Sequence, residues 1–329
     1  MLSLGDSTGH PLQLLDRAAL ERCAPDYDAR VAADPDVDRF CTRSDWILPF
    51  HDAFHPGHEV VGARSAAGFV VLQSQGPLLA PLEGMWSFAS PLVGPGALEL
   101  LLELLRQRAP DRGLVHLAGL PPKAARTEAV IRALAPTHSL AHASTTLRCV
   151  ARLDDVDGFL ARRSAKFRAS LRAALRRVRA AGIEFAALDA RSGTEAESAY
   201  ARVLAVERRS WKAASGNGVD GGPMREFYAR MFPRLAARAA LRIVFATRGG
   251  EDVGYLSGGL AGTTFRGLQF SFDERFRALG LGNALQLEMV ARLSQNGVTA
   301  YDLGSESAYK VRWAEQRVAT IGVLARRRA

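Results

Sequence analysis

The residues best suited to bind an anion are Arg277, Gly280 and Gly282, which stand between a β-like run and an amphipathic segment. Glycine lets backbone N–H groups approach a ligand closely. The first N–H groups of a helix have no partner inside the helix, and the helix dipole adds partial positive charge there. A strand, a glycine turn and a helix start in this order are therefore predicted to hold an anion such as a pyrophosphate.

The elements that must position this turn follow from the pattern of apolar residues. Residues 265–273 read as a strand, and a helix is expected from about Asn283, because Leu285, Met289 and Leu293 recur every four residues. The same reasoning predicts more elements in this half of the chain: strands at 183–188, 241–247, 253–259 and 299–303, and helices at about 194–213 and 224–237. The fold class expected is α/β, with a mixed sheet.

The spacing Arg277-x-x-Gly280-x-Gly282 resembles the acyl-CoA pyrophosphate loop of the GNAT acyltransferases, Q/R-x-x-G-x-G/A. An ordinary strand–loop–helix with a glycine-rich turn is the alternative. The wider context resembles the GNAT branch related to Fem-type aminoacyl transferases and cellulose-biosynthesis-associated acetyltransferases. The matching pieces span roughly 160–315: the Arg-rich helix 162–181, Glu207-x-x-Ser210-Trp211-Lys212, the loop 277–282, Tyr301-Asp302 and Tyr309-Lys310-x-x-Trp313.

The resemblance implies a tandem arrangement of two GNAT-like domains. Residues 151–329 would form the catalytic domain, which binds acetyl-CoA or another acyl-CoA without a metal. Residues 1–150 would form a degenerate copy that shapes the acceptor cleft; an unrelated α/β domain is the alternative. The corresponding turn, residues 90–96, has no arginine, and its two prolines lack N–H donors. The implied coenzyme-binding residues are Phe272, Arg277, Leu279, Gly280, Leu281, Gly282 and Asn283.

The implied chemistry is direct attack of an amine on the thioester. From residue 143 onward the sequence has no histidine, and Cys149 is its only cysteine. Such a transfer instead needs a neutral amine, N–H groups for the oxyanion and a proton donor for the thiolate. Tyr309 stands where GNAT enzymes often keep a tyrosine acid, and Asp302 ends a strand beside the one that carries the loop. Glu207 is a second candidate base; the alternative is a surface glutamate paired with a neighbouring arginine.

Candidate substrate-binding residues flank these positions. Lys310 can bind the acceptor or an acyl carboxylate, but a salt bridge to Glu306 is the alternative. Trp211 and Trp313 are expected in the core or in a cleft wall. The set proposed for the acceptor is Trp211, Lys212, Lys310, Arg168 and Arg172.

The charge is unevenly placed along the chain. The net charge is +9, and the basic excess lies in residues 151–329. Residues 161–181 form an amphipathic helix with eight basic and no acidic residues, so an anionic partner is expected there, a solvated face being the alternative. Its basic residues are Arg162, Arg163, Lys166, Arg168, Arg172, Arg176, Arg177 and Arg179.

Other features narrow the class of protein. No apolar run is long enough for a membrane span, and the start has no signal-peptide pattern. Three cysteines without metal spacing indicate reduced thiols in a cytoplasmic protein. His51, His55 and His58 invite a metal site, but the intervening Pro-Gly breaks the helix that would align them.

Three functions remain open from the sequence. The first is an acyl-CoA-dependent N-acyltransferase with a small-molecule or peptide amine as acceptor. The second is a Fem-like transferase that takes its acyl group from aminoacyl-tRNA, which the basic half favours. The third is a non-catalytic protein on the same fold that binds anions or nucleic acid.

Overall fold

The computed structural model describes residues 12–108, 113–215 and 218–328, which divide into two compact units. The first unit runs to Leu147 and takes up the chain again from Ala319; the second is Arg148–Val318. The predicted boundary at 150 lies close to this division. The prediction that the chain end belongs to the second part differs from the structure, because strand β13 (Gln316–Arg327) pairs with β6 (Leu114–Leu120) of the first unit.

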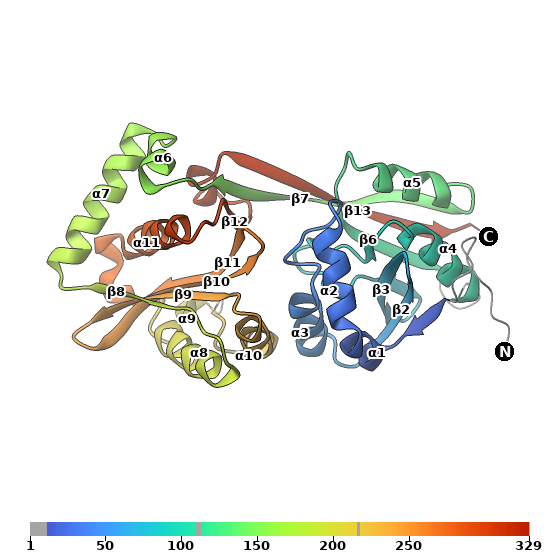
Figure 1. Cartoon of the computed structure of the whole chain (residues 1–329), viewed down its shortest axis with the longest axis horizontal. Helices are drawn as coiled ribbons and strands as arrows, with labels where there is room; N and C mark the ends of the chain where they lie inside the picture. The colour runs from blue at the N-terminus through green and yellow to red at the C-terminus, as the bar shows by residue number, and fades with distance from the viewer. Residues whose placement is uncertain (1–11, 109–112, 216–217, 329) are drawn as a thin grey trace. The chain divides into compact units, whose positions relative to one another are not determined.

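The first unit is a mixed sheet accompanied by the helices α1 to α5 (Figure 1). Its strand order is β1-β2-β3-β4-β6-β13, and β5 pairs with β3. Leucines of α4 pack on β2 and β3 to form the core. The elements are β1 (Gln13–Leu15), α1 (Arg17–Arg22), α2 (Ala24–Ala33), α3 (Ser44–Phe54), β2 (Glu59–Ser65), β3 (Gly68–Gln75), β4 (Leu78–Ala80), β5 (Leu92–Val93), α4 (Ala97–Arg108), β6, α5 (Ala125–Leu134), the start of β7 (His138–Arg152) and the end of β13.

Residues 85–90 form no strand, although their apolar residues also read as one in the sequence. The segment is instead a loop around the buried carboxylate of Glu83, which accepts hydrogen bonds from the N–H groups of Trp86 (2.6 Å) and Phe88 (3.1 Å). Backbone donors used in this way are not available to a sheet.

The second unit is built on the strand order β7-β12-β11-β10-β9-β8. Two of its long helices start at a capping serine: Ser164 caps α7, and Ser192 with Glu195 forms a capping box at α8. The elements are α6 (Val156–Ala161), α7 (Ala165–Ala180), β8 (Glu184–Leu188), α8 (Gly193–Glu207), α9 (Trp211–Ser215), α10 (Gly222–Ala237), β9 (Leu241–Arg248), β10 (Glu251–Ala261), β11 (Thr264–Phe272), the 3-10 helix η1 (Glu274–Leu279), α11 (Leu281–Gln295), β12 (Ala300–Ser305) and η2 (Lys310–Arg312).

Helices cover both faces of this sheet (Figure 1). The helix α11 packs on one face and is itself covered by α7, whereas α8 and α10 lie on the other face. The predicted apolar stripe of α11 is buried here, with Leu285, Met289 and Leu293 in the same core as Phe265 and Tyr301. The prediction of a mixed α/β fold is confirmed.

Strands β11 and β12 pair in parallel only at their beginnings. The register joins Thr264–Arg266 to Ala300–Asp302, and the remainder of β11 has no partner in β12. On its other side, β11 pairs along its length with β10, with an irregularity at Ser257/Gly258. The two central strands therefore part toward the end of β11, which leads into η1 and α11.

No helix among residues 12–108, 113–215 and 218–328 is long and apolar enough to cross a membrane.

Candidate active site

The start of α11 presents backbone N–H groups after a sharp turn. Gly280 has a left-handed conformation, with φ of 75°, and its carbonyl accepts hydrogen bonds from the N–H groups of Asn283 (3.0 Å) and Ala284 (3.3 Å). Within the described structure, the N–H groups of Leu281 and Gly282 have no recorded acceptor. These two donors stand at the positive end of the helix dipole, so they can hold an anionic group.

The two glycines of this turn are also required by packing. A Cβ atom on Gly280 would lie 3.2 Å from the Cβ of Ala174 in α7, and one on Gly282 would lie 3.1 Å from the rings of Phe270 and Phe272. Arg177 of α7 donates through Nε to the carbonyl of Leu279 at 3.2 Å. The space where each glycine lacks a side chain is thus filled by neighbouring protein atoms and is not open to a ligand. The expectation that these glycines leave room for a ligand to approach is corrected by this packing. The amide groups remain the binding feature.

The implied coenzyme residues lie together around this turn. Arg277 is exposed and its Nη1 pairs with Glu274 at 2.7 Å, so its guanidinium lies at the surface near the helix start. Phe272 ends β11 and is half-buried. The set on this short stretch is Phe272, Arg277, Leu279, Gly280, Leu281, Gly282 and Asn283.

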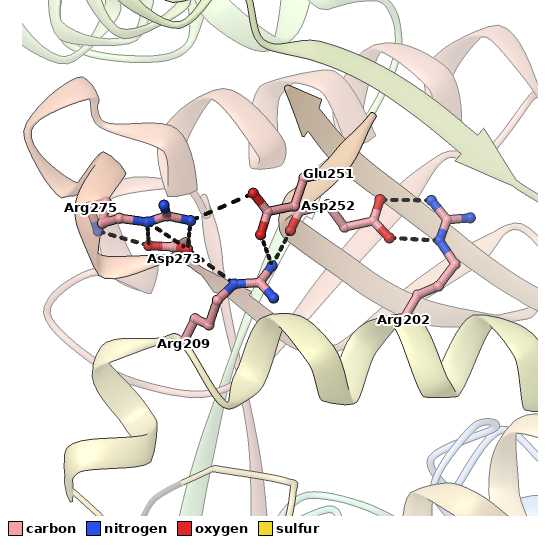
Figure 2. Close-up of polar contacts among 6 residues, drawn as sticks. All are labelled: Arg202, Arg209, Glu251, Asp252, Asp273 and Arg275. Atoms are coloured by element: carbon pink, nitrogen blue, oxygen red, sulfur yellow. Dashed lines mark hydrogen bonds and ion pairs between the residues drawn. The ribbon is translucent and has the colours of Figure 1, made fainter. Parts of the chain in front are cut away.

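An ion-pair network ties this loop to the end of α8 (Figure 2). The Asp273 carboxylate caps η1 and pairs with both Arg275 (2.7 Å) and Arg209 (3.2 Å). Arg209 also reaches Glu251 at 3.4 Å, and the N–H of Glu274 donates to the Arg209 carbonyl at 3.1 Å. The loop therefore begins at a fixed position relative to the turn that follows α8.

Figure 2 also shows a second pair from the same helix, in which both Nε and Nη2 of Arg202 donate to the Asp252 carboxylate at 2.8 Å. The sequence reasoning did not single out Arg202, Arg209, Asp252 or Asp273. Their partners are far apart in the sequence, so no local spacing reveals them.

Glu207 is fully buried at the end of α8, in a polar network. Its carboxylate accepts a short hydrogen bond from the Tyr255 hydroxyl and one from Ser210 at 3.4 Å, and it lies 3.7 Å from the ammonium of Lys212. The alternative of a surface glutamate paired with arginine is therefore wrong. Buried carboxylates with several donors are typical of functional sites as well as of structural networks.

Lys212 connects this network to β11. Its ammonium donates to the side chain of Gln269 (2.8 Å) and to the carbonyl of Phe270 (2.7 Å). Burial lowers the pKa of Lys212, while the charge of Glu207 opposes that shift. Trp211, next in sequence, is 40% exposed and is not a core residue. Tyr255 and Gln269 were missed by the sequence reasoning, because neither belongs to a recognisable motif.

Asp302 has a different environment from the one expected of a base. Its carboxylate pairs with Arg148 and Arg266, each at 2.5 Å, and accepts the N–H of Gly304 at 2.8 Å. A carboxylate held by two guanidinium groups stabilises their burial and has little capacity left for a substrate proton. The structure therefore favours a positioning role for Asp302 and not the role of a general base.

Tyr309 lies beside the half of β11 that does not pair with β12. Its ring stacks on Phe270 with centroids 5.7 Å apart. The hydroxyl is buried and faces Gln286 and Trp313, and burial raises the pKa of Tyr309. The residue is at the parting of the strands, as expected, but its hydroxyl can reach a thioester only if the ring turns away from Phe270.

Lys310 is half-buried beyond the end of β12. The expected alternative, an ion pair with Glu306, is absent, because Glu306 pairs with Arg317 at 2.7 Å. Burial, followed by the charge of Arg266, lowers the pKa of Lys310.

Arg168 and Arg172 lie on α7, whereas the Glu207 network lies at the end of α8. Arg168 donates to the carbonyl of Arg163, and Arg172 is exposed. The buried face of α7 carries Phe167, Leu171, Ala174 and Val178, and neither arginine belongs to that face.

The histidines of the first unit do not gather around a metal position. Nε2 of His51 lies 3.0 Å from the carbonyl of His58, and the rings of His55 and His58 stack at 5.0 Å. Across the described ranges, no group of three or more histidine, cysteine, aspartate or glutamate side chains is placed to hold a metal ion.

Comparisons with known proteins agree with this architecture. Residues 165–311 match the family model described as the acetyltransferase (GNAT) domain, and no curated protein matches the sequence. The crystal structure of FemX is similar over 92% of this chain and 95% of its own, with 12% identity and a TM-score of 0.64. L-PGS from Bacillus licheniformis is similar over 92% and 91%, with 13% identity and a TM-score of 0.58.

A third solved structure is the C-terminal domain of a putative lysylphosphatidylglycerol synthetase from Agrobacterium fabrum, similar over 95% of this chain and 93% of its own, with 13% identity and a TM-score of 0.59. At such identities the likeness establishes the fold alone. The family match covers α7 to β12, which includes the turn at Gly280 and the Glu207 network. The chain thus has the fold of FemX, and residues 165–311 of its second unit match the acetyltransferase (GNAT) domain.

Proposed function

We propose that this protein is an N-acyltransferase that takes an acyl group from acyl-CoA and passes it to an amine. The observation that carries the proposal is the start of α11, where the N–H groups of Leu281 and Gly282 have no recorded acceptor in the described structure and Arg277 is exposed nearby. In a GNAT domain this turn supplies the donors for a pyrophosphate. The acetyl group is the first donor to test.

The Glu207–Lys212 pair is the proposed proton acceptor for the attacking amine. Glu207 is fully buried, so a substrate proton reaches it by way of Lys212. Lys212 passes its own proton to Glu207 and takes one from the amine, which leaves the pair with one proton more. The lowered pKa of Lys212 favours this exchange. The amine nitrogen then forms the amide bond as the carbon–sulfur bond breaks.

Tyr309 remains the proposed proton donor for the leaving thiolate. A thiol has a pKa of about 8.5, so protonating its thiolate near neutral pH requires only a weak acid. The proposal requires the Tyr309 ring to move from Phe270 when the donor binds, because its hydroxyl is buried. Trp211 and Lys212 are proposed to contact the acceptor.

Calorimetry with acetyl-CoA tests the donor site. Replacing Arg277 by Gln is expected to weaken binding about tenfold, because one charged hydrogen bond contributes roughly 1.5 kcal/mol or more. Arg292→Gln is the matched control, since Arg292 stands at the other end of α11 and pairs with Glu288 as Arg277 pairs with Glu274. Absence of acetyl-CoA binding to the wild-type protein would remove the proposal.

Aminoacyl-tRNA is the second candidate donor, and the basic surface of α7 favours it. Four arginines share one stripe, because their spacing of three or four residues repeats the helical turn. No ion pair is recorded for these side chains within the described ranges. Arg162, just before α7, is by contrast neutralised by ion pairs with Asp154 and Glu315. The stripe consists of Arg168, Arg172, Arg176 and Arg179.

Salt-dependent tRNA binding separates this candidate from the first. Changing Arg172, Arg176 and Arg179 to Gln is expected to leave the Tm near the wild-type value and to reduce the slope of log K against log salt by about 3. The control triple removes the same charge from another helix: Arg225 and Arg230 of α10 and Arg238 at its C-cap. Equal effects of both triples would show that the stripe has no specific role.

A further inference from the structure

The ammonium group of Lys310 belongs to a half-buried residue just beyond β12. Its backbone N–H donates to the Ser307 hydroxyl at 3.4 Å, but no hydrogen bond or ion pair is recorded for its ammonium within the described part of the chain. A half-buried charge without a partner is costly, because desolvation is not offset by an opposite charge. Glu306, the nearest carboxylate in sequence, is paired with Arg317.

The surroundings of Lys310 are positively charged. Arg266 and Lys212 lie close enough for their charges to lower its pKa, after the larger effect of burial. Asp302 opposes this shift, but its carboxylate is already shared by Arg148 and Arg266. The cations of this cluster, Arg148, Lys212, Arg266 and Lys310, therefore outnumber its carboxylates, Asp302 and Glu207.

The cluster lies on the face of the sheet opposite to α11. Phe265 and Tyr301 are neighbours in register and pack in the α11 core. The next pair in register, Arg266 and Asp302, points to the opposite face, because successive side chains of a strand alternate. A ligand beside Lys310 is thus distinct from a pyrophosphate at the start of α11.

The residue beside the ammonium, Gly304, has no side chain. Gly304 has a φ of 80°, and a Cβ placed there would lie 3.5 Å from Nζ of Lys310. The N–H of Gly304 already donates to Asp302. A larger residue at position 304 would therefore crowd the ammonium.

We infer that Lys310, with Arg266 and Lys212 behind it, forms a subsite for an anionic group of the acceptor, either a carboxylate or a phosphate. The inference rests on the proposed function, since it assigns the acceptor to the face that carries Lys212 and Glu207. It narrows the acceptor to an amine that also bears a negative charge, and so excludes neutral and polycationic amines as preferred substrates.

Lysine labelling tests the subsite directly, because the chain has only four lysines: Lys123, Lys166, Lys212 and Lys310. Reductive methylation of the full chain is followed at each lysine by mass spectrometry, at constant ionic strength, in chloride, inorganic phosphate or acetate. Lys123 and Lys166 are exposed and serve as internal controls. Lys212 is expected to react slowly throughout, because its ammonium is hydrogen-bonded.

In chloride, Lys310 is expected to be labelled faster than the exposed lysines, since a lowered pKa leaves more of the amine neutral. An anion present at a concentration ten times its Kd should slow labelling of Lys310 about 11-fold, because only the anion-free protein reacts. Slowing by phosphate alone assigns a phosphate acceptor, and slowing by acetate assigns a carboxylate acceptor. Equal rates in all three salts, or no labelling of Lys310 in chloride, would overturn the subsite.

A thermal-shift comparison gives a second readout. Phosphate or acetate should raise the Tm of the wild-type protein and of Lys166→Met above the value in chloride, but not that of Lys310→Met. Labelling of the wild type keeps the test decisive if Lys310→Met does not fold. Both experiments omit coenzyme, so failure of acetyl-CoA binding in calorimetry and failure of the anion subsite are separate results.

Discussion

At the scale of single residues, two carboxylates of the second unit differ in what surrounds them. Glu207 is contacted by a tyrosine, a serine and a lysine, whereas Asp302 is held by two arginines. A lysine can exchange a proton within its pKa range, but a guanidinium stays charged. We therefore propose Glu207 for proton transfer and Asp302 for holding charge.

Substitution by the isosteric amide should separate these roles. Glu207→Gln is expected to lower turnover about 10²- to 10⁴-fold, because it removes the final proton acceptor while keeping the shape of the network. Asp302→Asn leaves Arg148 and Arg266 partly uncompensated and should cost roughly 3 kcal/mol or more of unfolding free energy. Steady-state kinetics with an amine that the wild type acylates, together with urea denaturation, gives both quantities. The reverse outcome, with turnover lost only in Asp302→Asn, would exchange the two assignments.

The lowered pKa of Lys310 has a consequence for stability against pH. Between the folded pKa and the ordinary value of 10.5, the unfolded chain binds more protons than the native protein, so wild-type stability rises with pH in that window. Lys310→Met lacks this dependence. Its stability relative to the wild type should therefore be greatest near neutral pH and decline as pH approaches about 10.

Urea denaturation at several pH values, without phosphate, measures the unfolding free energy of Lys310→Met minus that of the wild type. The charged groups whose fields act on Lys310 are Arg266, Lys212, Asp302 and Cys149. Lys166→Met, at an exposed site on α7, provides the comparison. If the stability of Lys310→Met relative to the wild type instead increases with pH, the Lys310 ammonium is stabilised in the native protein.

At the scale of secondary structure, α7 and the turn before α11 form one packed unit. Ala174 of α7 lies against Gly280, and Arg177 donates to Leu279. The same helix carries the basic stripe on its outer side. The Arg-rich helix of the sequence is therefore both a support for the candidate coenzyme turn and a charged surface.

Two glycines at opposite ends of α11 allow this support to be measured. Gly280 and Gly297 have nearly the same backbone, with φ of 75° and 73°, but a Cβ at Gly297 meets no atom within 4 Å. Gly297→Ala should cost only the left-handed strain, about 1–2 kcal/mol. Gly280→Ala should cost roughly 1–3 kcal/mol more, because its methyl group presses on Ala174.

Guanidinium chloride denaturation of both variants gives the comparison, and calorimetry with acetyl-CoA shows whether the turn keeps its function. Equal destabilisation would mean that α7 moves aside freely and does not fix the turn.

At the scale of the whole molecule, the chain returns to its first unit at its end. The strand β13 pairs with β6 from Ile321 to Arg326, and Val323 and Ala325 are buried in the first core. The first unit therefore includes residues that follow the second unit in sequence.

Deletion of residues 319–329 should consequently destabilise the first unit. Loss of the strand and of the buried Val323 is expected to cost at least about 3 kcal/mol, and β6 should become open to proteases. Deletion of 327–329 is the control, because it keeps every position of β13 that pairs with β6. Limited proteolysis with mass spectrometry locates the cleavages. Protection of β6 in the longer deletion would show that the first unit is complete without β13.

The sequence by itself determined the features that depend on residues close together along the chain. The strand, the turn with Gly280 and the buried stripe of α11 follow from local spacing and periodicity, and the family match over 165–311 agrees with the resemblance seen in those motifs. The amphipathic nature of α7 was visible for the same reason.

Only the tertiary structure decided which side chains meet. Glu207 is joined to Tyr255 across 48 residues, and Asp302 to Arg148 across 154 residues. The sequence favours Asp302 over Glu207 as the candidate base, and the structure reverses this order. Burial and hydrogen-bonding partners, rather than residue type, determine whether a carboxylate can accept a proton. The return of β13 to the first unit was likewise hidden, since strand pairing depends on edges that only the folded sheet provides.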